Sequence, residues 1–247
     1  ILYKHLFAKR VLHHAKAIIS PSEYYIDESK FLGEYRNKVF PIPNGINVEE
    51  FELSYSKDEC KEKLGLTGKK VILFVGSLFH LKGQHVLLNS IPSILKQYKD
   101  AIFVFMGGGD VEKYQKISAE LKVTNDVLFP GYVQGKLKTA YYNAADIFVL
   151  PSLVEVFPLV LLESSASSLP LVVSNLDTFK CIVREGYNGI FTLSGDENSL
   201  KDAILMLLKN DDLRFKMGVN AFQHVKNFSW TKIAEDTEKL YKKIITS

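Results

Sequence analysis

Two carboxylates with seven residues between them, Glu155 and Glu163, are the side chains best suited to chemistry in this sequence. They flank a segment that opens on Phe157-Pro158 and continues with the apolar spacing of a helix. Proline suits the first helical position, because its missing N–H would have no partner there. We therefore expect a helix over residues 158–167, with Glu155 on the preceding loop and Glu163 inside the helix.

The start of that helix indicates an anion site. The free amides of Leu159 and Val160 would lie between the two acids, at the positive end of the helix dipole, where phosphate groups bind. At 1.5 Å per residue, the span from Phe157 to Glu163 is about 9 Å. The segment offers acceptors for hydroxyls at both ends and donors for phosphate between them, which matches a sugar–diphosphate–ribose. The alternative is an amphipathic α/β segment with two solvated acids.

The stretch from Ala145 to Val173 resembles the E-x7-E signature of retaining, GT-B-fold glycosyltransferases, the glycosyltransferase family 4 (group 1). The flanking A-D-I-F-V-L-P-S and L-P-L-V-V strengthen the resemblance. It implies that Glu155 holds the hydroxyls of the donor sugar and that Glu163 holds those of the ribose. Further donor contacts are implied at the start of the helix: Phe157, Pro158, Leu159 and Val160. Pro158 and Ser168 stand where the family usually has glycine.

A loop bounded by glycines supplies a cation. Gly76-Ser-Leu-Phe-His-Leu-Lys82-Gly83 follows an expected strand, and in an open α/β sheet ligands bind beyond the carboxyl ends of the strands. The order is wrong for a P-loop, in which the lysine follows the second glycine. The loop is similar to the family's G-R-x-x-x-x-K-G, whose arginine and lysine hold the donor diphosphate. The expected donor contacts of this loop are Gly76, Ser77 and Gly83, with Ser77 in place of the arginine. A solvated surface lysine is the alternative for Lys82.

Two further turns resemble segments of the family that face the donor. Phe105-Met-Gly-Gly-Gly-Asp110 resembles its G-x-G turn, with Gly108 as the expected contact. Phe129-Pro-Gly-Tyr-Val133 resembles the segment whose backbone pairs with the nucleobase, with Tyr132 and Val133 as expected contacts. A plain turn after a strand is the alternative for each.

The order of elements from residue 71 onward predicts the fold class, α/β with a Rossmann-like doubly wound parallel sheet. Short, continuous, β-branched strands alternate with helices, as a parallel sheet covered on both faces requires. Strands are expected at residues 71–75, 102–105, 127–129, 147–150, 171–173 and 189–193. Helices are expected at residues 84–98, 111–121, 136–143, 158–167, 199–208 and 211–225.

The resemblance implies the second domain of a GT-B fold with a remnant of the first. Residues 1–50 would be the tail of the N-terminal acceptor domain and the crossing between the domains, because residues 39–47 resemble V-I-P-N-G-V-D. Residues 51–228 would bind the nucleotide sugar. Residues 229–247, which open on Ser229-Trp230, would form the helix that crosses back. A first domain of about 150 residues would precede residue 1.

The composition of the chain limits the classes of partner and the compartment that we expect. The 247 residues carry a net charge of only +3 and no basic block with interleaved aromatics, so nucleic acid is not expected. No apolar run approaches the ~18 residues of a membrane span. Cys60 and Cys181 match no metal spacing and suit a reducing, cytoplasmic compartment. The first segment predicts a basic amphipathic helix, with Ile1, Leu2, Leu6, Val11 and Leu12 near one face. This helix, or the missing domain, could contact the inner face of a membrane, although packing of the helix on the missing domain is favoured.

The leading hypothesis is a hexosyltransferase-type glycosyltransferase of polysaccharide or glycoconjugate biosynthesis. By resemblance, it would move a sugar from a nucleoside diphosphate sugar to an acceptor hydroxyl with retention, without a cofactor or a catalytic metal. Lys82 and the helix N-terminus would stabilise the leaving diphosphate. The 247 residues of this sequence are expected to be inactive by themselves, because the catalytic cleft needs both domains.

Two other hypotheses stay open. Ser77 and the altered loop at residues 177–181 motivate a non-catalytic nucleotide-sugar-binding subunit of the same fold. A nicotinamide-binding Rossmann enzyme is the third hypothesis, and the absence of G-x-G-x-x-G after residues 71–75 counts against it.

Overall fold

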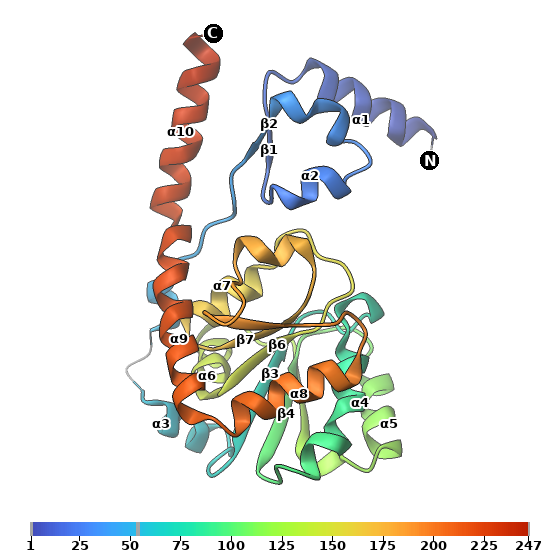
Figure 1. Ribbon diagram of the computed structural model, residues 1–247, viewed down its shortest axis with the longest axis vertical. Helices are drawn as coiled ribbons and strands as arrows, with labels where there is room; N and C mark the ends of the chain where they lie inside the picture. The colour runs from blue at the N-terminus through green and yellow to red at the C-terminus, as the bar shows by residue number, and fades with distance from the viewer. Residues whose placement is uncertain (1, 53–54, 247) are drawn as a thin grey trace.

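The computed structural model describes residues 2–52 and 55–246, whose main body is a six-stranded parallel sheet (Figure 1). The strands are β3 (Lys70–Val75), β4 (Ala101–Met106), β5 (Val127–Gly131), β6 (Ile147–Leu150), β7 (Leu171–Ser174) and β8 (Gly189–Thr192). Their order is β5-β4-β3-β6-β7-β8. The chain runs outward from β3 to β5, crosses back to β6 and continues to β8, so the strand order reverses between β3 and β6. This confirms the predicted doubly wound α/β fold.

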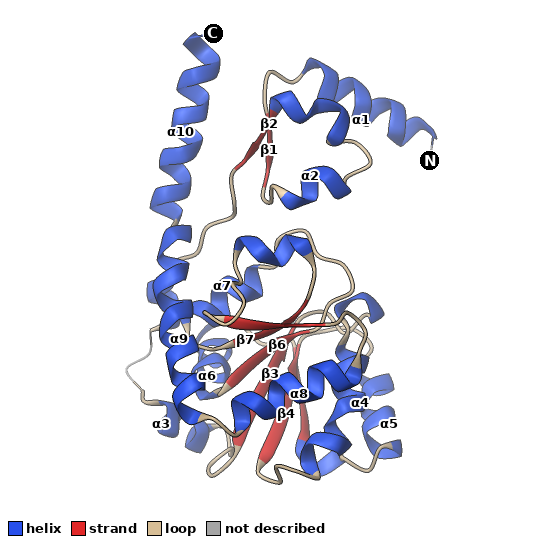
Figure 2. Cartoon of the chain, viewed as in Figure 1, coloured by secondary structure: helices blue, strands red, loops and turns tan. Residues whose placement is uncertain are grey.

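Helices lie on both sides of the strands (Figure 2). They are α3 (Lys57–Lys63), α4 (Gln84–Leu95), α5 (Val111–Glu120), α6 (Gly135–Ala144), α7 (Leu159–Ala166), α8 (Glu197–Leu208) and α9 (Asp211–Val225). α4 packs against α5 and α8, whereas α7 packs against α9 and α3 against α6. Every residue of β4, β6 and β7 is buried, because both faces of the sheet are covered.

The predicted strands are confirmed to within two residues at either end, and the predicted helices to within three. One helix of the sheet domain, α3, was not expected from the sequence. It begins after Ser56, whose hydroxyl accepts a hydrogen bond from the Glu59 amide while the Glu59 carboxylate accepts one from the Ser56 amide. This capping box has the S-x-x-E spacing that marks a helix start, so the signal was present in the sequence.

The N-terminal elements lie beside the sheet domain and not within it (Figure 1). They are α1 (Leu2–His14), β1 (Ile18–Ser20), α2 (Tyr24–Glu28) and β2 (Val39–Pro41), and β1 pairs in parallel with β2. The last helix, α10 (Trp230–Thr246), runs from the sheet domain alongside these elements. Ile42 packs against Ile233 and Leu240 of α10. Short 3-10 helices complete the described chain: η1 (Gly33–Lys38), η2 (Val48–Phe51), η3 (His80–Lys82), η4 (Thr124–Asp126), η5 (Asp177–Cys181) and η6 (Lys226–Phe228).

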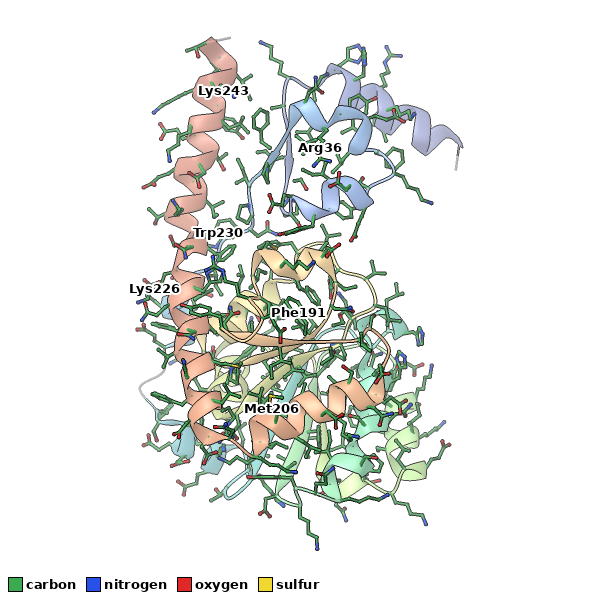
Figure 3. The ribbon with its side chains drawn as sticks, in the orientation of Figure 1. Arg36, Phe191, Met206, Lys226, Trp230 and Lys243 are labelled. Carbon is green, nitrogen blue, oxygen red and sulfur yellow. The ribbon has the colours of Figure 1, made fainter. Side chains whose placement is uncertain are left out.

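The segment that joins the N-terminal elements to the sheet domain contacts the start of α10 closely. The Ile46 amide donates to the Phe228 carbonyl at 2.8 Å. A Cβ atom on Gly45 would lie 2.6 Å from the Trp230 ring, so glycine is required there. Figure 3 shows Trp230 at the start of α10, facing this crossing. The closing helix predicted from Ser229-Trp230 is therefore present, while the domain boundaries at residues 50 and 228 stay predictions.

The first helix bears on the predicted membrane contact. On α1, the side chains of Phe7 and Val11 are 63% and 52% exposed. Ile1 lies outside the described residues, as do the side chains of Leu2 and Leu6, so the predicted apolar face is described only in part. Within residues 2–52 and 55–246, no helix is both long enough and apolar enough to cross a membrane.

A buried ion cluster ties α3 to the sheet. Asp146, just before β6, accepts hydrogen bonds from the Lys61 ammonium at 2.7 Å and the Val71 amide at 2.8 Å, and Lys57 lies 3.6 Å away. Burial opposes ionisation of Asp146, but Lys57, Lys61 and the Val71 amide outweigh it and hold the pKa of this carboxyl below its ordinary value. The cluster thus fixes the start of the strand that leads into the Glu155 loop.

Ser168, just after α7, has an unusual backbone conformation. Ser168 has φ +56°, a left-handed conformation that glycine adopts without strain and other residues adopt at a cost of about 1–2 kcal/mol. Gly218 of α9 lies so close that its Cβ would be 2.2 Å from the Ser168 carbonyl oxygen. Ser168 therefore has the left-handed conformation that favours glycine, the residue of the resembled motif at this position.

Candidate functional site

Loops from several strands converge where the strand order reverses, at the carboxyl edge of the sheet. They enclose a pocket of about 580 Å³, here called the switch-point pocket. It is lined by Val75, Gly76, Ser77, Met106, Gly107, Gly108, Tyr132, Val133, Gln134, Gly135, Lys138, Val160 and Glu163. Open α/β sheets bind their ligands at such a reversal. Of the predicted donor contacts, it brings together Gly76, Ser77, Gly108, Tyr132, Val133, Val160 and Glu163.

Backbone hydrogen bonds hold the walls of this pocket together. The Gly76 amide donates to the Met106 carbonyl at 3.0 Å, and the Leu78 amide donates to the Gly108 carbonyl at 2.7 Å. A Cβ atom on Gly107 would lie 1.9 Å from the Gly76 carbonyl oxygen, so only glycine allows the turns after β3 and β4 to meet. The glycines predicted to face a ligand thus also close the turns on one another.

The helix between the two acids begins one residue later than predicted. Pro158 is the N-cap of α7, with an extended ψ of 109°, and not its first helical residue. N-cap residues take non-helical ψ while their carbonyl accepts the first helical bond, and the Pro158 carbonyl does accept from the Leu161 amide. Leu159 and Val160 are therefore the first helical residues, and their amides have no carbonyl one turn earlier to bind. The two residues therefore open the helix, one position later than expected, and their role as anion donors stays a prediction.

Glu155 and Lys82 meet as an ion pair. Glu155 Oε1 accepts from Lys82 Nζ at 2.6 Å and from the Ser152 hydroxyl at 3.0 Å. The Glu155 side chain is 9% exposed and that of Lys82 is 32% exposed. The two loops are also joined by the backbone, since the Leu153 amide donates to the Leu81 carbonyl at 2.9 Å. The lysine loop and the first acid therefore form one unit, and Lys82 is not a free surface lysine.

Lys82 is held next to the switch-point pocket. A Cβ placed on Gly76, which lines the pocket, would lie 3.9 Å from Lys82 Cγ. Gly83, the next residue, has φ +70°, and its Cβ would lie 1.8 Å from the Pro151 carbonyl oxygen. Glycine is therefore required for the lysine loop to approach the end of β6.

Glu163 is held by two donors from α6. Its Oε1 accepts from Lys138 Nζ at 2.8 Å, and its Oε2 accepts from the Tyr142 hydroxyl at 2.7 Å. Burial, and then the adjacent carboxylate, raises the pKa of the Tyr142 phenol well above its ordinary value. Sequence reasoning missed both donors. Their spacing of four residues in a predicted helix indicates a shared face, but nothing in the sequence shows that this face meets Glu163.

A second hollow of about 530 Å³, here called the linker pocket, lies against the same ion pair. Lys138 and Glu163 line both pockets. The linker pocket is completed by Gly45, Ile46, Asn47, Val48, Glu49, Glu50, Phe51, Leu159, Leu162, Ser229, Trp230 and Thr231. Leu159, the first residue of α7, thus lines this hollow and not the switch-point pocket.

Two predicted donor contacts belong to the core by their side chains. Phe157 is 8% exposed and packs against Phe228, with ring centroids 6.2 Å apart. Pro158 is buried as well. A role for these two residues in binding would therefore run through the backbone and the geometry of the turn.

Metal and thiol chemistry have little support among the described residues. Residues 2–52 and 55–246 hold no group of three or more His, Cys, Asp or Glu side chains that could bind a metal ion. Burial raises the pKa of the Cys181 thiol to about 11, so this thiol stays protonated at neutral pH. The prediction that no catalytic metal is needed stays a prediction.

The sheet order, the helices on both faces and the position of the pocket define a Rossmann-like domain of the kind that forms the C-terminal half of GT-B glycosyltransferases. The model of the family described as glycosyl transferases group 1 matches residues 56–224, more than half of the chain. The protein therefore belongs to this glycosyltransferase family.

Relatives and solved structures agree with this assignment. An uncharacterized glycosyltransferase of Methanocaldococcus jannaschii is 34% identical, and the phosphatidyl-myo-inositol mannosyltransferase of Mycobacterium leprae is 31% identical. Each match covers 83% of this chain and 54% of the relative, so the chain spans about half the length of these curated relatives. The structure of Anabaena HepE in complex with UDP and glucose superposes with a TM-score of 0.86 at 18% identity, over 97% of this chain and 66% of that one. At that identity the likeness establishes the fold alone.

Proposed function

We propose that this chain is the donor-binding part of a family 4 glycosyltransferase that moves a hexose from a nucleoside diphosphate sugar to an acceptor hydroxyl with retention. The observation that carries the proposal is that Glu163 and Val160, at the start of α7, line the switch-point pocket. The Lys82–Glu155 pair does not line the pocket but lies next to it, at Gly76. The complex of HepE with UDP and glucose supports the choice of ligand.

Each part of the donor has a matching group. The diphosphate lies on the free amides of Leu159 and Val160, at the positive end of the α7 dipole. Lys82 donates one hydrogen bond to Glu155 and, as an ammonium group, keeps two further N–H donors for phosphate oxygens. Glu163 accepts the ribose hydroxyls.

The nucleobase and the sugar lie at opposite ends of this arrangement. The backbone near Val133 pairs with the base, and the Tyr132 side chain, 75% exposed, is free to cover it. At the other end, Glu155 faces the hydroxyls of the sugar. Because Glu155 is nearly buried, its charge is poorly screened and bears on any positive charge that develops at the anomeric carbon.

The reaction follows from the placement of charge. The anomeric C–O bond to the diphosphate breaks, the acceptor oxygen bonds to the same carbon on the same face, and the acceptor proton passes to the leaving phosphate. Negative charge grows on the diphosphate as the bond breaks, and Lys82 with the α7 amides stabilises it without reorganising. This scheme requires neither a protein nucleophile nor a metal.

Replacing Glu163 by alanine is expected to weaken nucleotide binding by about ten- to a hundredfold. Hydrogen bonds to a charged group contribute about 1.5–3 kcal/mol, and the variant loses the acceptor of the ribose hydroxyls. Calorimetric titration of the 247-residue chain with UDP and with GDP measures the effect. Glu120→Ala, an exposed acid at the end of α5, is the matched control and should bind as the wild type does. If neither nucleotide binds the wild type, the site assignment fails; if Glu163→Ala binds equally well, the ribose role fails.

The 247-residue chain by itself is expected to bind the nucleotide without transferring the sugar. The curated relatives are about twice as long as the matched segment. By the proposed two-domain arrangement, the acceptor site belongs to the part beyond that match. Release of UDP or GDP from the corresponding sugar nucleotides, with a range of acceptor sugars, measures transfer. Robust turnover by the isolated chain would contradict the need for a second domain.

A non-catalytic nucleotide-sugar-binding subunit is the alternative. Ser77 lines the switch-point pocket at the position where the resembled motif has an arginine, and in the altered loop Lys180 donates to Asp177 at 2.5 Å. Turnover by a longer form of the protein would exclude this alternative.

For either function we infer a cytoplasmic protein, in keeping with the free thiols Cys60 and Cys181. Membrane contact would be made through α1 or through the part beyond the match.

A further inference from the structure

The two groups that donate to Glu163 come from one face of one helix. Lys138 and Tyr142 are four residues apart on α6, so their side chains lie one turn apart on the same side. Each donates to a different carboxylate oxygen, at 2.8 and 2.7 Å. A carboxylate has about four lone-pair sites, so each oxygen keeps the capacity to accept one more hydrogen bond. The carboxylate can therefore accept two hydroxyls side by side while α6 holds it.

Tyr142 is fixed by the core. Its side chain is fully buried, its ring meets that of Phe51 edge-on at 5.6 Å, and it stacks on Phe148 at 6.1 Å. The phenol cannot rotate away from Glu163 without disturbing this packing. Because its pKa is raised well above the ordinary value, the hydroxyl remains a donor across the physiological pH range. One oxygen of Glu163 is thus anchored by a rigid neutral donor.

Lys138 supplies the positive charge that pairs with the Glu163 carboxylate. Its ammonium lies 5.4 Å from the centre of the Phe51 ring as well as 2.8 Å from Glu163, and its side chain is 30% exposed. The Glu163 side chain is 19% exposed, so without a cation the ionised carboxylate would be partly desolvated and unpaired. The lysine also lines both pockets, and it therefore stands where a bound nucleotide would meet the carboxylate.

We propose that Lys138 and Tyr142 are positioning residues that hold the Glu163 carboxylate in the orientation that accepts the vicinal 2′- and 3′-hydroxyls of a ribonucleotide. The inference rests on the proposed function, because it takes a nucleoside diphosphate as the ligand of the switch-point pocket. Its consequence is that the preference for ribose over 2′-deoxyribose depends on α6 as well as on Glu163.

The test compares each ribonucleotide with its 2′-deoxy form. UDP, 2′-deoxy-UDP, GDP and 2′-deoxy-GDP are titrated calorimetrically into the 247-residue chain. The wild type is expected to bind the ribonucleotide about tenfold more tightly, the effect of one hydrogen bond to a charged group. In Lys138→Met and in Tyr142→Phe this ratio is expected to fall to about two, since the hydroxyl then meets a mobile carboxylate. Lys138→Arg keeps the cation and should restore most of the ratio.

Controls separate positioning from folding and from the proposed function. Lys136→Met, an exposed lysine on the same helix, should keep the wild-type ratio, and thermal unfolding checks that each variant is folded. A purely structural role would weaken the binding of both nucleotides and leave their ratio unchanged. A wild-type ratio in both variants, or equal binding of the two forms by the wild type, overturns the inference while nucleotide binding stands. If the wild type binds none of the four nucleotides, the proposed function fails, and the inference fails with it.

Discussion

Replacing Gly83 by alanine is expected to destabilise the protein by about 4 kcal/mol or more, among the largest effects of a single added methyl group. The added Cβ would lie 1.8 Å from the Pro151 carbonyl oxygen, and the backbone there has φ +70°. Backbone atoms on both sides of the contact leave no flexible side chain to move aside. The lysine loop would have to withdraw from the end of β6, so the Lys82–Glu155 pair should be lost with it.

Gly68→Ala separates the two causes of this effect. Gly68 has a similar φ of +75°, but nothing lies within 4 Å of its added Cβ. Its replacement should therefore incur only the conformational cost of about 1–2 kcal/mol. Urea denaturation of the wild type and the two variants measures both losses. Equal losses would contradict the close approach of Gly83 to Pro151, and a folded Gly83→Ala variant with unchanged nucleotide binding would remove the loop from the site.

The Asp146→Ala variant is expected to lose about 3–5 kcal/mol of unfolding free energy, the usual effect of removing one partner from a buried ion pair. Asp146 is 5% exposed and Lys61 is 7% exposed. Without the carboxylate, the Lys61 ammonium and the Val71 amide lose the acceptor that they share. The bonds from Lys57 to the Ala145 carbonyl and from Lys61 to the Lys69 carbonyl would remain, but the carboxylate that pairs with these two lysines would be gone.

A double variant and a pH series test this explanation. Asp146→Ala/Lys61→Met should be more stable than Asp146→Ala alone, because it removes the unpaired buried charge. Since the folded-state pKa of Asp146 is lowered, its contribution is complete above the ordinary value near 4 and declines as the pH falls through the folded-state value. The stability difference between wild type and Asp146→Ala should therefore shrink below about pH 4. A constant difference, or a double variant less stable than the single one, would contradict the charge argument.

The candidate site was predictable where its chemistry follows the chain. Glu155 and Glu163 flank a short helix, and local signals placed its first free amides at Leu159 and Val160, although Pro158 proved to be the N-cap. Lys82 was expected at the site because its loop follows a buried strand, whose end lies at the carboxyl edge of the sheet, and because the loop resembles the family's G-R-x-x-x-x-K-G. The positions of these residues follow from the periodicity of the elements, whereas their roles were implied by the resemblance.

Other parts of the site depend on which side chains meet across the fold. The sequence indicated neither that Lys82 pairs with Glu155 nor that Tyr142 binds Glu163. The same limit applies to Phe157, which was predicted to contact the donor but has its side chain packed against Phe228. These contacts join residues 21 to 73 positions apart, and no local pattern encodes them.

The sequence by itself determined the alternation of strands and helices, the glycine turns and the two acids around α7, because each of these depends on backbone conformation and on neighbours in the chain. Only the tertiary structure decided how the charges combine. It paired each acid with a lysine from another element and placed the Lys138–Glu163 pair between two pockets. The physical reason is that an ion pair forms wherever packing brings opposite charges together, and packing is a property of the whole fold.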